Sequence, residues 1–250
     1  MGVDIAAISM AEALDVIERF VAEGGPHVVV TANVDHLMLL QRDAAFREVY
    51  DRAELITCDS IPLKWALSFL GRSVKGRVAG ADMVYALAER AAAKGLRLFF
   101  LGAAPGVAAA AAASLSRRYP GLQVVGTYSP PVMAWRELAE DAATLETVRG
   151  TRPDVLLAAL GAPKQEMWLD AVRERMGVPV GIGVGAAFDF AAGTLRRAPV
   201  WVQKLGLEWL WRLFQEPRRL WRRYLFIDLR FIFIVLKEKY RGKNRGTASE

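Results

Sequence analysis

Short apolar runs recur along the first three quarters of the chain, separated by segments long enough for helices. Six of these runs are rich in β-branched residues and predict buried strands at residues 27–33, 53–58, 96–102, 122–128, 154–161 and 179–185. Alanine-rich stretches at 79–95 and 105–121, each stopped by Gly or Pro-Gly, predict helices between them. Such alternation builds βαβ units, so we expect an α/β fold with a Rossmann-like, mostly parallel sheet and flanking helices.

The pattern changes near Pro199. Beyond it the chain sets basic residues against tryptophans and large apolar side chains, and no further strand is predicted. We therefore expect an α/β domain over residues 1–198 and a helical, basic and amphipathic appendage over residues 199–250.

Charge separates these two parts further. The chain of 250 residues has a net charge of +6, yet residues 212–245 alone hold eleven Lys or Arg against three acids, a net charge of +8. The remainder, at −2, is close to neutral, so the basic end alone is expected to meet an anionic surface or ligand. A lone cysteine, Cys58, and two histidines exclude a disulfide framework and a zinc-ligand cluster. The first residues are acidic and unlike a signal peptide, so we expect a cytoplasmic protein.

Drawn as a helix, the segment after residue 216 gathers its basic side chains on one side and most of its apolar side chains on the other. Asp228 and Arg230 interrupt the apolar run, which is shorter than the about 20 apolar residues that a helix needs to cross a bilayer. We expect this helix to lie in the interface of an anionic membrane. The alternative is that it packs on the body or between copies of a homo-oligomer.

Ligands of open parallel sheets bind at the carboxyl ends of the strands, and three polar side chains follow the first two predicted strands there. Asp59 comes directly after an apolar strand, and Thr31 and Asn33 lie at the end of the strand before it. Each could simply cap the helix that follows, and from spacing alone capping is the better explanation for Asp59. Cys58 has no basic neighbour in sequence and is expected to be a buried core thiol.

Two further segments after strands could contact a ligand. Gly102 to Gly106 form a small-residue turn that opens a helix, where free backbone amides could hold a phosphate, although most such turns only join a strand to a helix. The turn also lacks the full dinucleotide fingerprint. Gln165 lies in the first turn of a helix opened by Pro163, and its amide suits recognition of a sugar or a base edge, with a solvated position as the alternative.

Taken together, several motifs resemble one family. They are "TANVDH", "CDSIPLKWALSFLG", "GRVAGADM", "LGAAPGVA", "YPGLQVVGTY", "LGAPKQEMW" and "GVGAAFDFAAGTLRRAPVWVQKLGLEWLWRLFQEPRRLWRRY". In this order they are similar to motifs of the WecG/TagA/CpsF glycosyltransferases, and the resemblance runs from about residue 3 to residue 226. It implies a membrane-associated, inverting enzyme that moves a sugar from a UDP-sugar to a polyprenyl-diphosphate-linked sugar. The implied pathways are the synthesis of cell-wall polymers, capsules and exopolysaccharides.

The resemblance also implies roles for individual residues. Asp59 matches the carboxylate proposed as catalytic base. The matching pocket residues are Thr31, Asn33, Arg77 and Gln165, and the matching arginines of the appendage, thought to close over the nucleotide diphosphate, are Arg212, Arg219 and Arg222. The chain has no Asp-x-Asp pair to hold a divalent metal, so arginines are expected to neutralise the diphosphate without a metal or another cofactor.

Two other classes of protein share parts of this pattern. A nucleic-acid-binding or membrane-binding module without catalysis would explain the basic, aromatic end. However, the basic residues lie beside an apolar face and no nucleic-acid-binding motif is present, so we expect no nucleic acid partner. A nucleotide-dependent oxidoreductase would share the parallel sheet but needs the glycine-rich fingerprint that this chain lacks.

Overall fold

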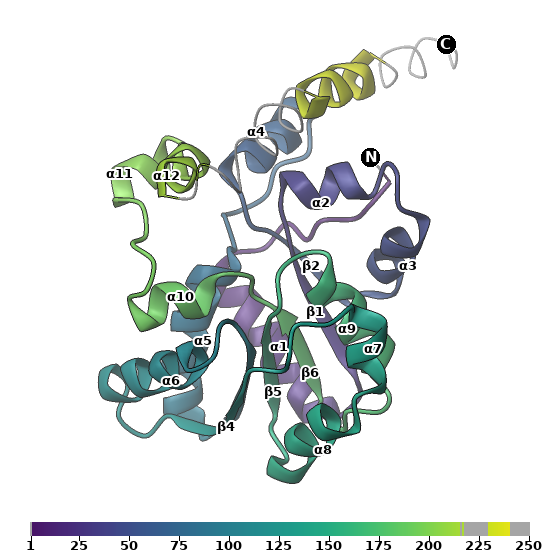
Figure 1. The fold of residues 1–250 in the computed structure, drawn as a ribbon. Coiled ribbons are helices and arrows are strands. Elements are labelled where there is room, and N and C mark those ends of the chain that lie inside the picture. Colours follow the sequence, from purple (N-terminus) through teal and green to yellow (C-terminus); the bar gives the residue numbers. More distant parts are fainter. Residues whose placement is uncertain (1, 216, 218–229, 241–250) are drawn as a thin grey trace.

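The structure, a computed structural model, describes residues 2–215, 217 and 230–240, and its centre is a parallel sheet (Figure 1). The six strands pair in the order β2-β1-β6-β5-β3-β4. They are β1 (His27–Ala32), β2 (Leu55–Cys58), β3 (Arg97–Gly102), β4 (Gln123–Tyr128), β5 (Val155–Ala159) and β6 (Val180–Gly183). All five pairings are parallel, which confirms the predicted α/β fold and each predicted strand to within three residues at either end.

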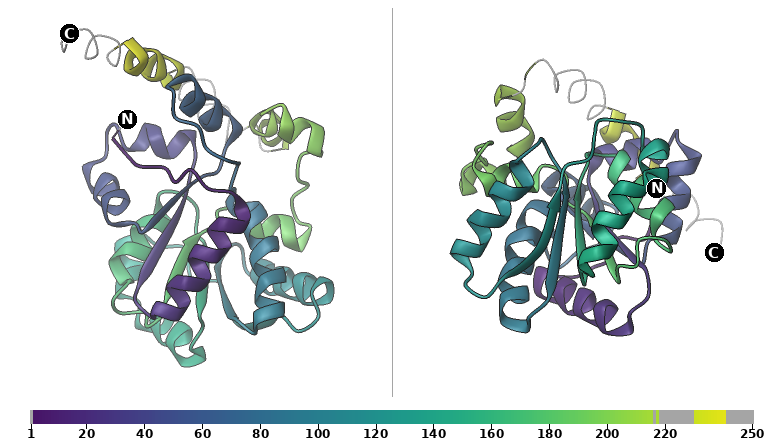
Figure 2. Two further views of the ribbon diagram at one scale, coloured as in Figure 1. Left: turned by 180° about the vertical axis from the view of Figure 1, so that it is seen from behind. Right: turned by 60° about the horizontal axis from the view of Figure 1, so that its bottom comes forward.

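Helices cover both faces of the sheet. One face carries α2 (Val34–Leu39), α3 (Ala44–Arg52), part of α4 (Ile61–Phe69), α7 (Trp135–Glu140), α8 (Ala142–Thr151) and α9 (Lys164–Val172). The other face carries α1 (Met10–Glu23), α5 (Gly80–Lys94), α6 (Val107–Arg118) and α10 (Ala187–Ala192). Figure 2 shows α1, in purple, lying over this second face when the molecule is seen from behind. The two alanine-rich helices predicted from the sequence are α5 and α6.

The strands are apolar on both sides because each side faces a layer of helices. Val28 and Val30 of β1 belong to the core cluster of the first face, whereas Val29 belongs to the cluster of the second face. Side chains of a strand alternate between faces, so a strand covered on both sides reads as a continuous apolar run. This is why the strands could be found as runs in the sequence.

Two glycines of β6 let α9 lie unusually close to the sheet. A Cβ atom on Gly181 would be 2.8 Å from Cδ2 of Leu169, and one on Gly183 would be 2.7 Å from Nε2 of Gln165. Both glycines lie on the face that carries α9, where any other residue would push the helix outward. The close approach brings the first turn of α9 against the carboxyl end of β6.

The chain beyond α10 leaves the sheet. It forms α11 (Val200–Lys204) and α12 (Glu208–Gln215), and residues 230–240 are also helical. Phe231 and Val235 are buried with the core of the first face, so this part of the appendage packs on the body. Within the described ranges, no helix has the length and apolar character needed to span a bilayer. The division of the chain at residue 198 stays a prediction.

We expect Gly181→Ala to destabilise the fold by about 1–3 kcal/mol, because the new methyl group overlaps Leu169 in a core without spare room. For a chain of this size that corresponds to a fall in melting temperature of about 2–10 °C. Gly150→Ala is the matched control, because Gly150 lies inside α8 and a Cβ atom there meets nothing within 4 Å. It should raise the melting temperature slightly. Equal melting temperatures for the two variants would contradict the packing argument.

Candidate functional site

The predicted site residues converge at the carboxyl ends of the strands. The chain leaves β1 toward the face that carries α2 and leaves the neighbouring β6 toward the face that carries α10, so the two connections diverge there. A divergence of this kind opens a crevice at which α/β proteins bind ligands. Thr31 ends β1, Asn33 follows it, Asp59 follows the adjacent β2, and Gln165 begins α9 beside β6. The structure therefore brings these four residues to one edge of the sheet.

Asp59 is the half-buried carboxylate of this edge. Its backbone N–H donates to the carbonyl of Ala32 (2.8 Å), which continues the pairing of β2 with β1. No described residue makes a hydrogen bond to its side chain, and α4 begins at Ile61 without a side-chain cap, so capping was the wrong explanation for this residue. Next to it, Oγ of Ser60 is buried and has no hydrogen-bond partner among the described residues. The carboxylate is thus left available to a ligand.

Burial raises the pKa of Asp59 to about 7. The charge of Arg77 opposes this increase in pKa, the charges of Glu208 and Asp82 add to it, and the charge of Arg197 opposes it. Removal from water disfavours the charged form of a carboxylate, which is why burial is the main cause. A group with a pKa of about 7 can both accept and release a proton near neutral pH.

Arg77 and Arg197 hold a network of ion pairs beside Asp59. Arg77 donates to Asp82 (2.7 Å), to Gln203 of α11 (3.0 Å) and to Glu208 of α12 (2.8 Å). Arg197 donates to the other oxygen of Asp82 (2.5 Å) and lies 3.5 Å from Glu208. Two arginines and two carboxylates therefore join the start of α5 to the helices of the appendage. Arg77 is one of the predicted pocket residues, and in this structure its guanidinium group donates hydrogen bonds to the carboxylates of Asp82 and Glu208.

The loop that carries Arg77 is fastened to β2. The backbone N–H of Val78 donates to the carbonyl of Cys58 (2.8 Å), and Oγ1 of Thr57 donates to the carbonyl of Val78 (3.0 Å). Because these bonds lie one residue from Arg77 and one or two residues from Asp59, they keep the cation near the carboxylate. Cys58 itself is buried, and burial raises the pKa of its thiol to about 12, with the charge of Asp59 as the second cause. The predicted buried core thiol is confirmed.

Thr31 and Asn33 have structural partners. Asn33 is the N-cap of α2, where its side chain accepts from the backbone N–H of His36 (3.2 Å). Thr31 is buried and donates to the carbonyl of Gly183 (3.0 Å), a bond that links the ends of β1 and β6. A Cβ atom on Gly80 would lie 3.1 Å from Oγ1 of Thr31, so the start of α5 abuts the same point. Both side chains shape the floor of the crevice.

Gln165 is buried rather than solvated, and it begins a chain of buried polar groups. Its Oε1 accepts from the backbone N–H of Gly185 (3.1 Å), and its Nε2 donates to Oε1 of Glu166 (2.7 Å). That oxygen lies 3.7 Å from Nε2 of His36, whose Nδ1 is 2.6 Å from the hydroxyl of Tyr50. Burial lowers the pKa of His36, against the opposing charge of Glu166, so the imidazole is neutral near pH 7. The other oxygen of Glu166 is buried without a hydrogen-bond partner in the described structure.

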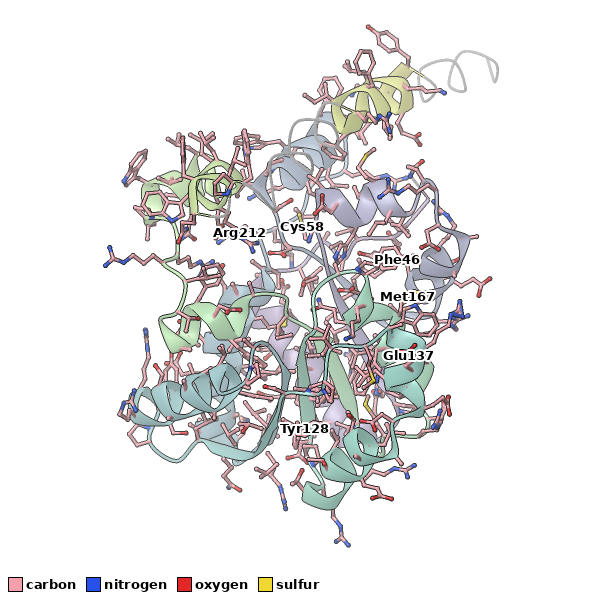
Figure 3. All side chains as sticks on the ribbon, in the orientation of Figure 1. Phe46, Cys58, Tyr128, Glu137, Met167 and Arg212 are labelled. Carbon is pink, nitrogen blue, oxygen red and sulfur yellow. The ribbon has the colours of Figure 1, made fainter. Side chains whose placement is uncertain are left out.

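The remaining predicted ligand residues are placed as follows. Arg212 is partly exposed on α12 and lies at the level of Cys58 in the view of Figure 3. Arg219 and Arg222 lie outside the described residues. Gly102 has a positive φ of 104° and approaches β5 so closely that a Cβ atom would be 2.5 Å from the carbonyl oxygen of Ala159, and Gly106 is the N-cap of α6. Packing against β5 accounts for Gly102, and a role of this turn in phosphate binding stays a prediction.

Two of the hollows on the surface of the described structure differ in their relation to the site. One, of about 460 Å³, is formed by residues 2–6 and 50–56 and contains none of the predicted site residues. The other, of about 330 Å³, is lined by Asp82, Tyr85, Arg118 and Arg197. Nη2 of Arg197 is buried and has no hydrogen-bond partner among the described residues. The second hollow therefore adjoins the ion-pair network and offers cations to an anionic ligand.

Sequence reasoning missed most partners of the site. Asp82, Arg197, Gln203 and Glu208 form the network, but they are separated from Arg77 by 5 to 131 positions along the chain. Glu166, which directly follows the predicted residue Gln165 in the first turn of α9, was also missed. A carboxylate inside an otherwise apolar helix face was the one available signal.

Comparison with known proteins agrees with this geometry. Residues 1–245 match the model of the "Glycosyl transferase WecG/TagA/CpsF family". Over 211 residues the chain is 32% identical to an N-acetylglucosaminyldiphosphoundecaprenol N-acetyl-beta-D-mannosaminyltransferase of Bacillus spizizenii, covering 84% of this chain and 79% of that protein. Over 216 residues it is 30% identical to the enzyme of the same name from Bacillus subtilis, covering 86% and 81%. The chain therefore belongs to the WecG/TagA/CpsF family of glycosyltransferases.

Proposed function

We propose that this glycosyltransferase moves a sugar from a UDP-sugar to a sugar linked to polyprenyl diphosphate, with inversion at the anomeric carbon and without a metal ion. The observation that carries the proposal is Asp59. Its carboxylate is half-buried, has no hydrogen bond from a described residue, has a pKa of about 7, and lies near Arg77 and Arg197. A base beside cations is the arrangement that this transfer needs.

Asp59 would act as the general base. A hydroxyl of the acceptor sugar gives its proton to the carboxylate while its oxygen attacks the anomeric carbon of the donor. The bond from that carbon to the diphosphate oxygen breaks at the same time, and the electron pair leaves with UDP. A single displacement of this kind inverts the anomeric centre and needs one carboxylate. General-base assistance typically contributes a factor of about 10² to 10⁴ in rate.

Arg77 and Arg197 would neutralise the departing diphosphate. Guanidinium groups make paired, charge-assisted hydrogen bonds to phosphate oxygens, and these bonds strengthen as negative charge develops on the leaving group. The carboxylates of Asp82 and Glu208 now occupy positions on both arginines. A diphosphate would compete with them, and Nη2 of Arg197, which is buried without a partner among the described residues, would gain an acceptor if the network opened. Arg212, and Arg219 and Arg222 from outside the described residues, would complete the set.

The relatives suggest which substrates to try first. Both carry the name of an enzyme that transfers N-acetylmannosamine to N-acetylglucosaminyldiphosphoundecaprenol. We propose a UDP-N-acetylhexosamine as donor and a GlcNAc-diphosphate-linked polyprenol as acceptor for this chain. Such an acceptor is held in a bilayer, so the proposed site of action is the cytoplasmic face of the cell membrane, with the basic appendage against anionic lipid.

We expect Asp59→Asn to lower turnover by about 10²- to 10⁴-fold, because an amide of the same shape cannot accept the hydroxyl proton. Transfer would be measured with a panel of UDP-sugars and a GlcNAc-diphosphate acceptor, and UDP affinity would be measured on the same preparation. UDP affinity should change little. Near-normal turnover of the variant would remove Asp59 as the base.

The same variant should be more stable than the wild type at alkaline pH. The pKa of Asp59 is about 7 in the folded chain, whereas an unfolded chain leaves it at its ordinary value of 3.8. Ionisation of Asp59 therefore opposes folding, and the resulting loss of stability grows from about pH 4 to pH 7. Asp59→Asn removes that loss. Its melting temperature should exceed that of the wild type at pH 8, and the difference should shrink as the pH falls toward 4. An unfolded variant at pH 8 would instead assign Asp59 a structural role.

Glu208→Gln should move the acid limb of the kcat/KM profile to lower pH by about half a pH unit. The charge of Glu208 raises the pKa of Asp59, and its loss also frees two arginines whose charges lower that pKa. Kinetics between pH 5 and 9 would measure the shift. Glu146→Gln, an exposed acid on α8, is the control and should leave the limb in place. A limb that moves to higher pH would exclude Asp59 as the titrating group.

Activity should persist in EDTA, because arginines supply the positive charge that a divalent metal supplies in other transferases. The rate of sugar transfer would be compared before and after chelation and again after addition of Mg²⁺ or Mn²⁺. Loss of activity in EDTA with recovery on metal addition would overturn the assignment of the diphosphate to arginines.

A further inference from the structure

Large apolar side chains are exposed mainly at one end of the described structure. They are Trp65 and Phe69 of α4, Val200, Trp201, Leu205, Leu207 and Phe214 of α11, α12 and their connection, and Ile232, Phe233, Leu236 and Tyr240, with Val132 as the exception elsewhere. Figure 1 shows α4, α11, α12 and residues 230–240 together at the upper end, beyond the carboxyl ends of the strands. An apolar surface of this extent marks a binding surface rather than ordinary solvent exposure.

Helix α4 occupies the middle of this surface and belongs to the body, not to the appendage. A Cβ atom on Gly206, in the turn between α11 and α12, would lie 2.9 Å from the ring of Trp65. At its other end, Nζ of Lys239 lies 2.5 Å from the carbonyl of Phe69 and 5.1 Å from the centre of its ring. Both parts of the appendage therefore border α4, and its exposed face continues theirs.

α4 also begins at the catalytic carboxylate. Ser60 is its N-cap, directly after Asp59, and the helix buries Leu63, Ala66 and Leu67 while it exposes Trp65, Ser68 and Phe69. At about 1.5 Å of rise per residue, Trp65 lies about 6 Å and Phe69 about 12 Å along the axis from Ile61, the first residue of the helix. The two aromatic residues are four positions apart, so they share one face of the helix. They are 54% and 48% exposed, which leaves about half of each ring free for a partner.

Along the sequence of α4, a cation stands between Asp59 and the aromatic residues. Lys64 is partly buried on α4, and its charge lowers the pKa of Cys58, the residue before Asp59. Read from its first turn, α4 thus offers a carboxylate, then an ammonium group, then two apolar rings. The proposed acceptor has the same order of chemistry: a sugar hydroxyl, a diphosphate and an isoprenoid chain.

We propose that α4 is the binding surface for the lipid-linked part of the acceptor, with Lys64 at its diphosphate and Trp65 and Phe69 along its first isoprene units. This inference rests on the proposed function, because it assigns the acceptor of the same site. A chain held along α4 positions the sugar hydroxyl at Asp59 while the rest of the lipid continues into the bilayer. Lys64 supplies a point charge to phosphate, and the rings supply apolar contact area.

The test compares a GlcNAc-diphosphate acceptor carrying a long polyprenyl chain with one carrying a short, water-soluble alkyl chain. For the double variant Trp65→Ser, Phe69→Ser, the KM for the long acceptor should rise about tenfold or more relative to the KM for the short acceptor, since apolar contact area is lost only with the former. Lys64→Gln should raise the KM for both acceptors. Val132→Ser, which removes an exposed apolar side chain elsewhere, should leave both KM values unchanged.

Three results would overturn the proposal. Equal losses with the two acceptors in the double variant would show that Trp65 and Phe69 only support the fold. Loss of binding to anionic vesicles without acceptor, in parallel with the rise in KM, would identify the bilayer and not the acceptor chain as the partner of α4. Unchanged KM values for both acceptors in the double variant, with normal transfer by the wild type, would reject the role of α4 alone. No transfer by the wild type to either acceptor would instead reject the proposed function as well.

Discussion

The ion pairs of Arg77 and Arg197 with Asp82 and Glu208 are the interaction on which the rest of the site depends. They hold α11 and α12 over the carboxyl ends of the strands, and their four charges act on the pKa of Asp59. Removing one partner from a poorly solvated group of this kind leaves its counterpart unpaired, which costs more than the pair contributes. The network therefore links two features that could have been separate: the placement of the appendage and the proton affinity of the carboxylate.

A second constraint lies on the other side of the crevice. β6 has glycine at both positions that face α9, and the room this leaves is filled by Leu169 at Gly181 and by Gln165 and Glu166 at Gly183. The buried amide is held at both ends, by Gly185 and by Glu166, so its orientation is determined before any ligand binds. A polar group fixed in this way has little conformational entropy left to lose when a ligand contacts it.

The fold was more accessible from the sequence than the site. Buried parallel strands are continuous apolar runs, so local pattern was enough to find all six, and the glycines and alanines of α5 and α6 marked those helices. Asp59 could be singled out as a carboxylate after an apolar strand, yet spacing alone favoured a cap, because a cap and a catalytic base have the same sequence pattern. Only the observed absence of a cap on α4 separates the two explanations.

The partners of the arginines could not be found in this way. Arg77 and Glu208 are 131 positions apart, and nothing local in either segment indicates that they meet. Exposure is equally a property of the folded chain: Trp65 and Phe69 are exposed, whereas Leu63, Ala66 and Leu67 of the same apolar helix are buried, and nothing local in the sequence separates the two sets. Amphipathic pattern fails for a helix that is apolar on both sides, because one side can face the core while the other faces lipid.

A transferase that joins a water-soluble donor to a lipid-linked acceptor must hold one substrate from water and one from the bilayer at the same carbon atom. In this chain Arg197 lines the second hollow and shares the carboxylate of Asp82 with Arg77, and the apolar rings of α4 begin a few residues beyond Asp59. Asp59 is where the polar and the apolar surfaces meet, which accounts for both its half-buried position and its raised pKa. Its proton affinity follows from the position that the chemistry requires, since a carboxylate at the boundary of an apolar surface is less hydrated than one in open solvent. The same boundary accounts for the exposed aromatic residues beyond the carboxyl ends of the strands, which have no counterpart elsewhere in the described structure.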